Sequence, residues 1–190
     1  MNVLGIYTSP REDGNTDTLM KELLRGARDA GAETTELFAR DLDIKLCIAC
    51  DQCIKLGHCF QVDDYGQVID ALQRADAVAF ATPVHFYTVG SHAKVLIDRI
   101  QSEWNKKYVA KVPEIVSRPE RPGALIAVGA TKGKTLFQGL RMTVYYFFDA
   151  VGVKLKHELC VPGIDHKGAI LEQPEIMMQA YDMGRALAGG

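Results

Sequence analysis

Residues 3–19 read VLGIYTSPREDGNTDTL, and an apolar run, a polar loop and a helical pattern follow one another in this stretch. The run 3–7 has the length and the apolar character of a buried strand. From Asn15 onward apolar residues recur at helical spacing, and Gly31 ends the pattern. These positions are Leu19, Met20, Leu23, Leu24, Ala27 and Ala30. The stretch therefore predicts a strand, a loop and a helix in that order.

The same alternation of strand and helix continues along the chain. We expect further strands at 34–39, 77–81, 124–128 and 153–161, with Thr82-Pro83 ending the strand at 77–81, and helices that begin near 63, 91, 135 and 174. Alternating strands and helices imply crossover connections and a parallel sheet, and strands that are apolar throughout imply helices on both faces. The sequence thus predicts a three-layer, doubly wound α/β fold with a five-stranded parallel sheet.

The length of 190 residues suits one domain, which we expect to span 1–190. Two segments interrupt its rhythm, a cysteine-rich insertion at 45–62 and an irregular segment at 104–122. The irregular segment contains Pro113, Pro119 and Pro122, and it is longer than an ordinary connection. It is expected to be either a surface loop or an oligomer contact or lid.

Composition excludes several classes of protein. The chain is 47% hydrophobic and 24% charged, which is ordinary for a globular domain and unlike a disordered or low-complexity chain. A net charge of −2 gives no sign of nucleic-acid binding. No apolar run approaches the roughly 20 residues of a membrane span. The N-terminus lacks the basic region of a secretion signal, so the expected location is the cytoplasm.

The loop at 8–16 carries groups that suit a phosphate. It has only one glycine, Gly14, so it does not match the G-x-G-x-x-G pattern of dinucleotide sites. Its donors are the hydroxyls of Thr8, Ser9 and Thr16, the amide of Asn15 and the guanidinium of Arg11. They precede a helix, whose N-terminus attracts anions. The alternative is that Asn15 or Thr16 only caps the helix.

Four of the five cysteines, Cys47, Cys50, Cys53 and Cys59, fall within 13 residues. Thiolates three residues apart can converge on one site, and short C-x2-C-x2-C runs with a fourth cysteine are typical of iron–sulfur clusters. Structural zinc sites more often use two separated C-x2-C pairs. A [4Fe-4S] cluster is therefore favoured over zinc, a disulfide or free redox-active thiols, which remain alternatives. Cys160 is read as an ordinary buried thiol.

Four motifs in the same order resemble the flavodoxin-like family of NADPH-dependent FMN reductases. They are the loop at 8–19, the cysteine run followed by Asp63-Asp64, the loop at 81–86 and the helix at 94–99. The cysteine run is similar to the compact motif of the iron–sulfur flavoproteins. The resemblance covers 1 to about 100 and the remainder more loosely. It implies a flavodoxin-like fold with strand order 2-1-3-4-5, FMN binding, and assembly as a homodimer or homotetramer.

The resemblance also implies roles for individual residues. Ser9, Arg11, Asn15 and Thr16 would hold the FMN phosphate, Pro83, Val84, His85 and Phe86 would lie along the isoalloxazine ring, and Ala130 and Thr131 would approach the ring's other edge. His85 departs from the family, which often has tyrosine there. Asp98 and Arg99 are expected to be structural, and no dedicated catalytic acid or base is expected.

The expected function is that of an FMN-dependent oxidoreductase or electron-transfer flavoprotein, in which a [4Fe-4S] cluster and FMN exchange electrons. NAD(P)H or ferredoxin would be the electron donor. Two alternatives stay open, a cluster-free NAD(P)H-dependent FMN or quinone reductase and a non-enzymatic FMN-binding electron carrier.

Overall fold

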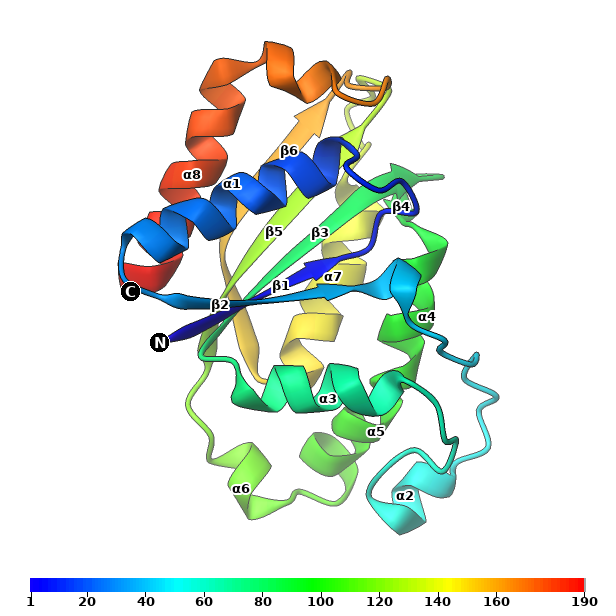
Figure 1. Cartoon of the computed structure of the whole chain (residues 1–190). Coiled ribbons are helices and arrows are strands. Elements are labelled where there is room, and N and C mark those ends of the chain that lie inside the picture. The colour runs from blue at the N-terminus through cyan, green and yellow to red at the C-terminus, as the bar shows by residue number, and fades with distance from the viewer. Residues whose placement is uncertain (190) are drawn as a thin grey trace.

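A computed structural model describes residues 1–189 and contains a twisted central sheet (Figure 1). Its parallel strands lie in the order β2-β1-β3-β5-β6, and a short strand, β4, pairs antiparallel with β3. The strands are β1 (Asn2–Tyr7), β2 (Glu33–Phe38), β3 (Ala77–His85), β4 (Thr88–Val89), β5 (Arg121–Gly129) and β6 (Val153–Pro162). The predicted fold class is confirmed, and the five parallel strands have the predicted order when β4 is set aside.

The prediction that β3 ends at Thr82-Pro83 is wrong. The strand continues to His85, and Pro83 stays in register with Val128 of β5. Proline has no N–H to donate, but it is tolerated near a strand end, where one missing ladder bond matters little. Beyond it, Phe86 and Tyr87 form a tight turn into β4, both with positive φ (48° and 64°). Hairpin turns of this kind usually contain Asn-Gly, so the sequence gives no turn signal here.

Helices cover both faces of the sheet (Figure 1). On one face lie α1 (Asn15–Asp29) and α8 (Pro174–Gly189), preceded by the short helix η3 (Ala169–Glu172). On the other lie α3 (Tyr65–Arg74), α4 (Ser91–Arg99), α5 (Gln101–Trp104) and α7 (Gln138–Ala150). The helix expected to begin near 91 is therefore divided into α4 and α5. No helix within residues 1–189 is both long enough and apolar enough to cross a membrane.

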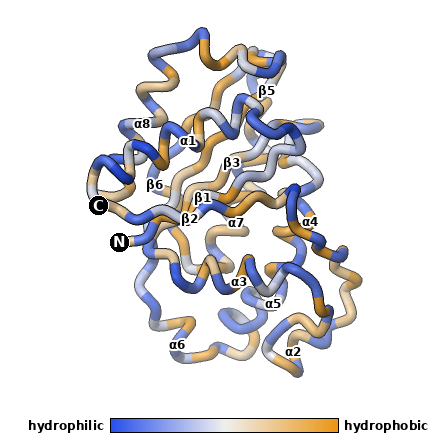
Figure 2. The backbone as a smooth tube through the Cα atoms, in the orientation of Figure 1, coloured by the Kyte–Doolittle hydropathy of each residue, from blue (hydrophilic) through white to orange (hydrophobic). Residues whose placement is uncertain are grey.

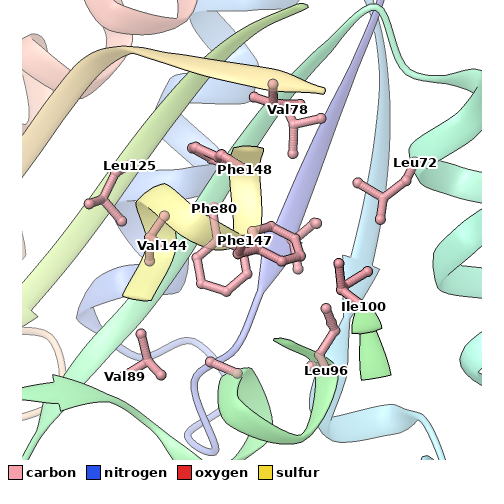
Figure 3. Packing of buried hydrophobic residues seen from close by; sticks show 14 of the residues in the cluster. Leu72, Val78, Phe80, Val89, Leu96, Ile100, Leu125, Val144, Phe147 and Phe148 are labelled. Carbon is pink, nitrogen blue, oxygen red and sulfur yellow. The ribbon is translucent and has the colours of Figure 1, made fainter. Parts of the chain in front are cut away.

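The sheet separates two apolar clusters because successive strand residues point to opposite faces. In β3, Val78 and Phe80 pack under α4 and α7, whereas Ala77, Ala79 and Ala81 pack under α1 and α8. Figure 2 shows the apolar strands at the centre, and Figure 3 shows Phe80 against Phe147 and Phe148 of α7. The ring centroids of Phe80 and Phe147 are 5.1 Å apart, within the range of favourable aromatic pairs.

Two glycines allow α1 and α8 to pack closely. A Cβ atom on Gly184 would lie 1.8 Å from the carbonyl oxygen of Leu23, and one on Gly26 would lie 2.0 Å from that of Tyr181. Neither position has room for a side chain, because the obstacle in each case is backbone. This contact fixes α8 against the C-terminal half of α1.

The cysteine segment lies at the lower right of Figure 1, and the segment 104–122 runs from beside it to α6 at the lower left. The cysteine segment contains only the short helix α2 (Gln52–Leu56), and η1 (Ala39–Asp41) precedes it. The segment at 104–122 contains η2, a π-helical turn (Asn105–Val109), and α6 (Pro113–Val116). The segment expected to be irregular thus has two helical turns, and η2 contacts α2.

Candidate functional site

A cavity of about 220 Å³ lies where β1, β3, β5 and β6 end at their carboxyl sides. Parallel α/β sheets bind ligands at this edge. Eight of the ten residues expected to contact FMN line it: Ser9, Arg11, Asn15, Thr16, Pro83, Val84, His85 and Ala130. Residues far apart in the sequence are therefore brought together around one hollow.

The first turn of α1 forms one wall of the cavity. Its N-cap is Gly14, and no side chain caps the helix among the residues that the structure describes. The N–H groups of the first turn have no partner inside an α-helix, and they make that end attractive to an anion. A Cβ atom on Gly14 would lie 3.0 Å from the carbonyl oxygen of Arg11. Glycine at this position therefore lets the loop pass close to the start of α1 without a steric clash.

The loop before α1 is fixed by its own hydrogen bonds. The backbone N–H of Arg11 donates to Ser9 Oγ (3.1 Å), and Arg11 Nη1 donates to the carbonyl of Asp165 (3.3 Å). Arg40 Nη1 donates to Asp17 Oδ2 (2.8 Å) and reaches the Ser9 carbonyl (3.4 Å). Burial raises the pKa of the Asp17 carboxyl above its usual value, and the Arg40 guanidinium opposes that rise. Arg40 thus links the loop at 8–16 to α1.

The side chain of Asn15 faces the segment after β6. Its Nδ2 donates to the His166 carbonyl (2.9 Å), and its Oδ1 accepts from the N–H groups of Gly168 (3.0 Å) and Ile170 (3.3 Å). The side-chain amide of Asn15 therefore makes three hydrogen bonds to backbone groups of the protein. Asn15 holds the segment 163–170 against the cavity, a role that the sequence did not indicate.

The opposite wall carries the residues expected along a flavin ring. Pro83, Val84 and His85 line the cavity, whereas Phe86 is fully exposed (101%) and does not. Thr131 also lies outside the lining, and its carbonyl accepts from the N–H of Gly163 (3.1 Å). Phe86 points away because the left-handed turn places it at the tip of the hairpin.

Six further lining residues were not among the ten expected to contact FMN: Pro10, Gly14, Val128, Ile164, Asp165 and Lys167. The last three come from the loop after β6. Their position at the end of a strand was the available signal, but nothing in their types marks a binding loop. The Lys167 ammonium and the Arg11 guanidinium make this side of the cavity suitable for a negatively charged group.

The four clustered cysteines line a second, smaller cavity together with Arg99, Gln101 and Ser102. All four are free thiols, Cys47 and Cys50 exposed and Cys53 and Cys59 half-buried. Within residues 1–189, no three Cys, His, Asp or Glu side chains lie close enough together to hold a metal ion. Four thiols around one cavity are the donor set that an iron–sulfur cluster requires. In the structure, however, their sulfur atoms are too far apart to bind one metal ion together.

A buried ion pair anchors the cysteine segment. Arg99 Nη1 donates to Asp63 Oδ2 (2.5 Å) and to the Lys45 carbonyl (2.8 Å), and both side chains of the pair are 1% exposed. Burial alone would raise the pKa of Asp63. Hydrogen bonds from Arg99 and from the backbone N–H groups of Lys45 and Tyr65 outweigh burial and lower that pKa. Arg99 is thus structural, as expected, and Asp98 pairs with Lys94 on the surface of α4.

Comparison with known proteins gives one family and several relatives. Residues 1–154 match the family model described as NADPH-dependent FMN reductase. Iron-sulfur flavoproteins of Methanocaldococcus jannaschii and Archaeoglobus fulgidus are 35% and 31% identical over 99 and 100 residues. These matches cover 52% and 53% of the chain, and 51% and 46% of the relatives, so the chain spans about half the length of the curated relatives it matches.

The overall fold resembles that of solved flavoenzymes. The structure of a flavone reductase superposes with a TM-score of 0.77 at 20% identity, and the match covers the whole chain and 62% of that protein. At this level of identity the likeness concerns the fold.

Proposed function

Because the chain belongs to the NADPH-dependent FMN reductase family, we propose that it is a flavin-dependent oxidoreductase that binds FMN in the cavity at the carboxyl ends of β1 and β3. We further propose that Cys47, Cys50, Cys53 and Cys59 hold a [4Fe-4S] cluster that exchanges electrons with FMN. Residues 1–190 would form one FMN-binding domain, assembled as a homodimer or homotetramer.

The observation that carries the FMN proposal is the uncapped first turn of α1, which opens into the larger cavity. The FMN phosphate would bind there, where the helix N-terminus supplies N–H groups and a favourable dipole. Ser9, Arg11 and Thr16 would add side-chain donors, and Asn15 would hold the segment 163–170 in place. A phosphate held by such charge-assisted hydrogen bonds is bound strongly and in one orientation.

The other wall would receive the ring. Pro83 and Val84 offer apolar contact, His85 offers a ring nitrogen at the edge of the cavity, and Ala130 leaves space beside β5. Thr131 would approach the ring's periphery from the rim, and Phe86, fully exposed at the tip of the hairpin, would reach the ring only by turning its side chain inward. When bound, FMN supplies hydride and single-electron chemistry, while the protein provides binding, orientation and electrostatics. No side chain is assigned the role of a catalytic acid or base.

The cluster proposal rests on the number, type and spacing of the thiols and on the cavity that they share. A bound cluster would supply one-electron transfer. Metal ligands commonly become ordered only when the metal binds, and the cysteine segment, exposed over most of 45–56, has room to rearrange. The relatives named iron-sulfur flavoproteins support the same assignment.

One observation favours a second candidate function. The thiols do not converge in the structure, as expected if the protein is a cluster-free FMN or quinone reductase that uses NAD(P)H. In either case the electron donor would be NAD(P)H, and ferredoxin is a further candidate if the cluster is present.

Anaerobic purification tests the proposal. A visible spectrum, an iron and sulfide assay and a test of flavin reduction by NADPH and by reduced ferredoxin are made on one sample. Flavin bands with about four irons per chain and reduction by either donor support the full proposal. Flavin bands with reduction but without iron support the cluster-free reductase. Flavin bands without reduction by either donor support the electron carrier, and failure of the folded protein to bind added FMN refutes the proposal.

A further inference from the structure

Asn105 occupies an unusual position next to the cysteine segment. It begins η2, the π-helical turn that follows α5, and its side chain is buried (3% exposed). Its Nδ2 donates a hydrogen bond to Cys53 Sγ at 3.0 Å. Isolated π-helical turns are rare and often occur at functional sites, where they redirect a side chain. The segment at 104–122 thus supplies one polar side chain to the cysteine cavity.

A neighbouring side chain orients the Asn105 amide. Gln101 Nε2 donates to Asn105 Oδ1 (3.4 Å), which leaves the N–H₂ side of the amide to face the sulfur. Gln101 itself lines the cysteine cavity. The amide therefore has one orientation that satisfies both partners, in which it is a donor toward Cys53.

The helical segment that carries Asn105 is fastened to the cysteine segment. Arg99, the last residue of α4, forms the buried ion pair with Asp63 and donates to the Lys45 carbonyl. Cys47 and Cys59 lie between these two attachment points in the chain. Arg99 therefore ties both ends of the cysteine segment to the helical segment that carries Asn105, and this keeps the Asn105 amide beside that segment.

We propose that Asn105 is a positioning residue for the proposed iron–sulfur centre, and that its N–H···S hydrogen bond to Cys53 raises the reduction potential of that centre. The inference rests on the cluster part of the proposed function and adds to it a residue outside the cysteine motif.

The physical reason is the change of charge on reduction. A cluster held by the four thiolates would gain one negative charge on accepting an electron from reduced FMN, which would be oxidised in turn, and part of that charge would fall on sulfur. A hydrogen bond to sulfur is stronger when the sulfur is more negative, so it stabilises the reduced state more than the oxidised state. Second-shell donors of this kind tune metal centres without binding the metal.

The test compares three variants of the full chain, purified anaerobically. Asn105→Leu removes the donor and keeps a side chain of similar size, and Asn105→Asp keeps the shape but replaces the N–H₂ group with oxygen. Lys106→Arg is the control, because it keeps the charge next to Asn105 and because the Lys106 ammonium binds Glu103 (2.8 Å) and not a thiol. Iron content, circular dichroism and the midpoint potential from a titration followed by electron paramagnetic resonance are measured for each.

Loss of one such hydrogen bond should change the ratio of reduced to oxidised centre about tenfold at a fixed potential, which corresponds to about 59 mV for a one-electron couple. We expect both Asn105 variants to keep their iron and to have lower midpoint potentials, the Asp variant lowest, whereas Lys106→Arg matches the wild type.

Three outcomes would overturn the inference. Wild-type potentials in folded, iron-loaded Asn105 variants would leave the cluster proposal standing and remove the role of Asn105. Loss of iron from both variants would show that Asn105 retains the centre and does not set its potential. Absence of iron from the wild-type protein would remove the cluster proposal and this inference together, while the FMN proposal would be unaffected.

Discussion

The hydrogen bonds of Asn15 lead to a prediction that separates two ways of binding FMN. Asn15 ties the segment 163–170 to the first turn of α1 through three hydrogen bonds, of 2.9, 3.0 and 3.3 Å. Ile164, Asp165 and Lys167 of that segment line the cavity. Replacing Asn15 with alanine should therefore release one wall of the cavity and weaken binding of the whole flavin, including the part without phosphate.

The magnitude follows from the bonds that are lost. Each hydrogen bond contributes about 0.5–1.5 kcal/mol net, so Asn15→Ala removes roughly 1.5–4.5 kcal/mol of attachment. In the variant, part of the free energy of flavin binding would be spent on ordering the segment 163–170 again. A loss of about 1.4 kcal/mol in binding free energy corresponds to a tenfold weaker affinity. We expect at least this change for both FMN and riboflavin, which lacks the phosphate.

Two further variants provide the contrast. Arg11→Ala should weaken FMN about tenfold and riboflavin much less, because the guanidinium would contact the phosphate and donates only one long hydrogen bond to the segment 163–170, at the Asp165 carbonyl (3.3 Å). Asn15→Asp keeps an oxygen for the N–H groups of Gly168 and Ile170 but adds a negative charge, so it should weaken FMN more than riboflavin. Quenching of flavin fluorescence gives each affinity. If Asn15→Ala weakened FMN alone, Asn15 would act on the phosphate and the reasoning from the segment 163–170 would be wrong.

Three other predictions concern the scaffold. Gly184→Ala should destabilise the protein by about 1–3 kcal/mol or more, because the new Cβ would meet the Leu23 carbonyl; Gly66→Ala, where nothing lies within 4 Å of the Cβ, is the control in thermal denaturation and should not lower the melting temperature. Because the pKa of Asp63 is lowered in the folded state, its carboxylate stabilises the fold above pH ~4. This contribution should disappear as the pH falls through the folded-state pKa. The free energy of unfolding of Asp63→Asn, measured by urea denaturation, should therefore depend less on acid pH than that of the wild type. Burial, with the nearby Glu158 carboxylate, raises the pKa of Cys160 to about 12, and in iron-free protein at pH 8 iodoacetamide should label Cys160 far more slowly than Cys47; equal rates would contradict this.

Periodicity along the chain predicted most of the architecture. Apolar runs located the central strands β1, β3 and β5, because strands covered by helices on both faces need apolar residues at nearly every position. The edge strands β2 and β6 carry exposed polar residues and were located from the alternation of strands and helices. The hairpin at 82–89 was missed because β4 has only two residues and its turn is made by Phe86 and Tyr87 in place of glycine or asparagine.

In the candidate site, too, local motifs could be predicted from the sequence and contacts between distant segments could not. Residues such as Ser9 and His85 could be predicted because they follow strands directly and belong to local motifs. The contacts of Asn15 could not, because its partners are backbone groups more than 150 residues away, and backbone partners leave no trace in the sequence. The bond from Asn105 to Cys53 joins two segments 52 residues apart, and a π-helical turn has no sequence pattern that predicts it.

The most direct test of the account is a calorimetric titration of FMN into flavin-free protein whose fold has been checked by circular dichroism. The account predicts saturable binding of one FMN per chain, much weaker binding of riboflavin, and competition by inorganic phosphate at the first turn of α1. Absence of FMN binding to the folded protein, or equal affinities for FMN and riboflavin, would contradict the assignment of the α1 N-terminus as the phosphate site.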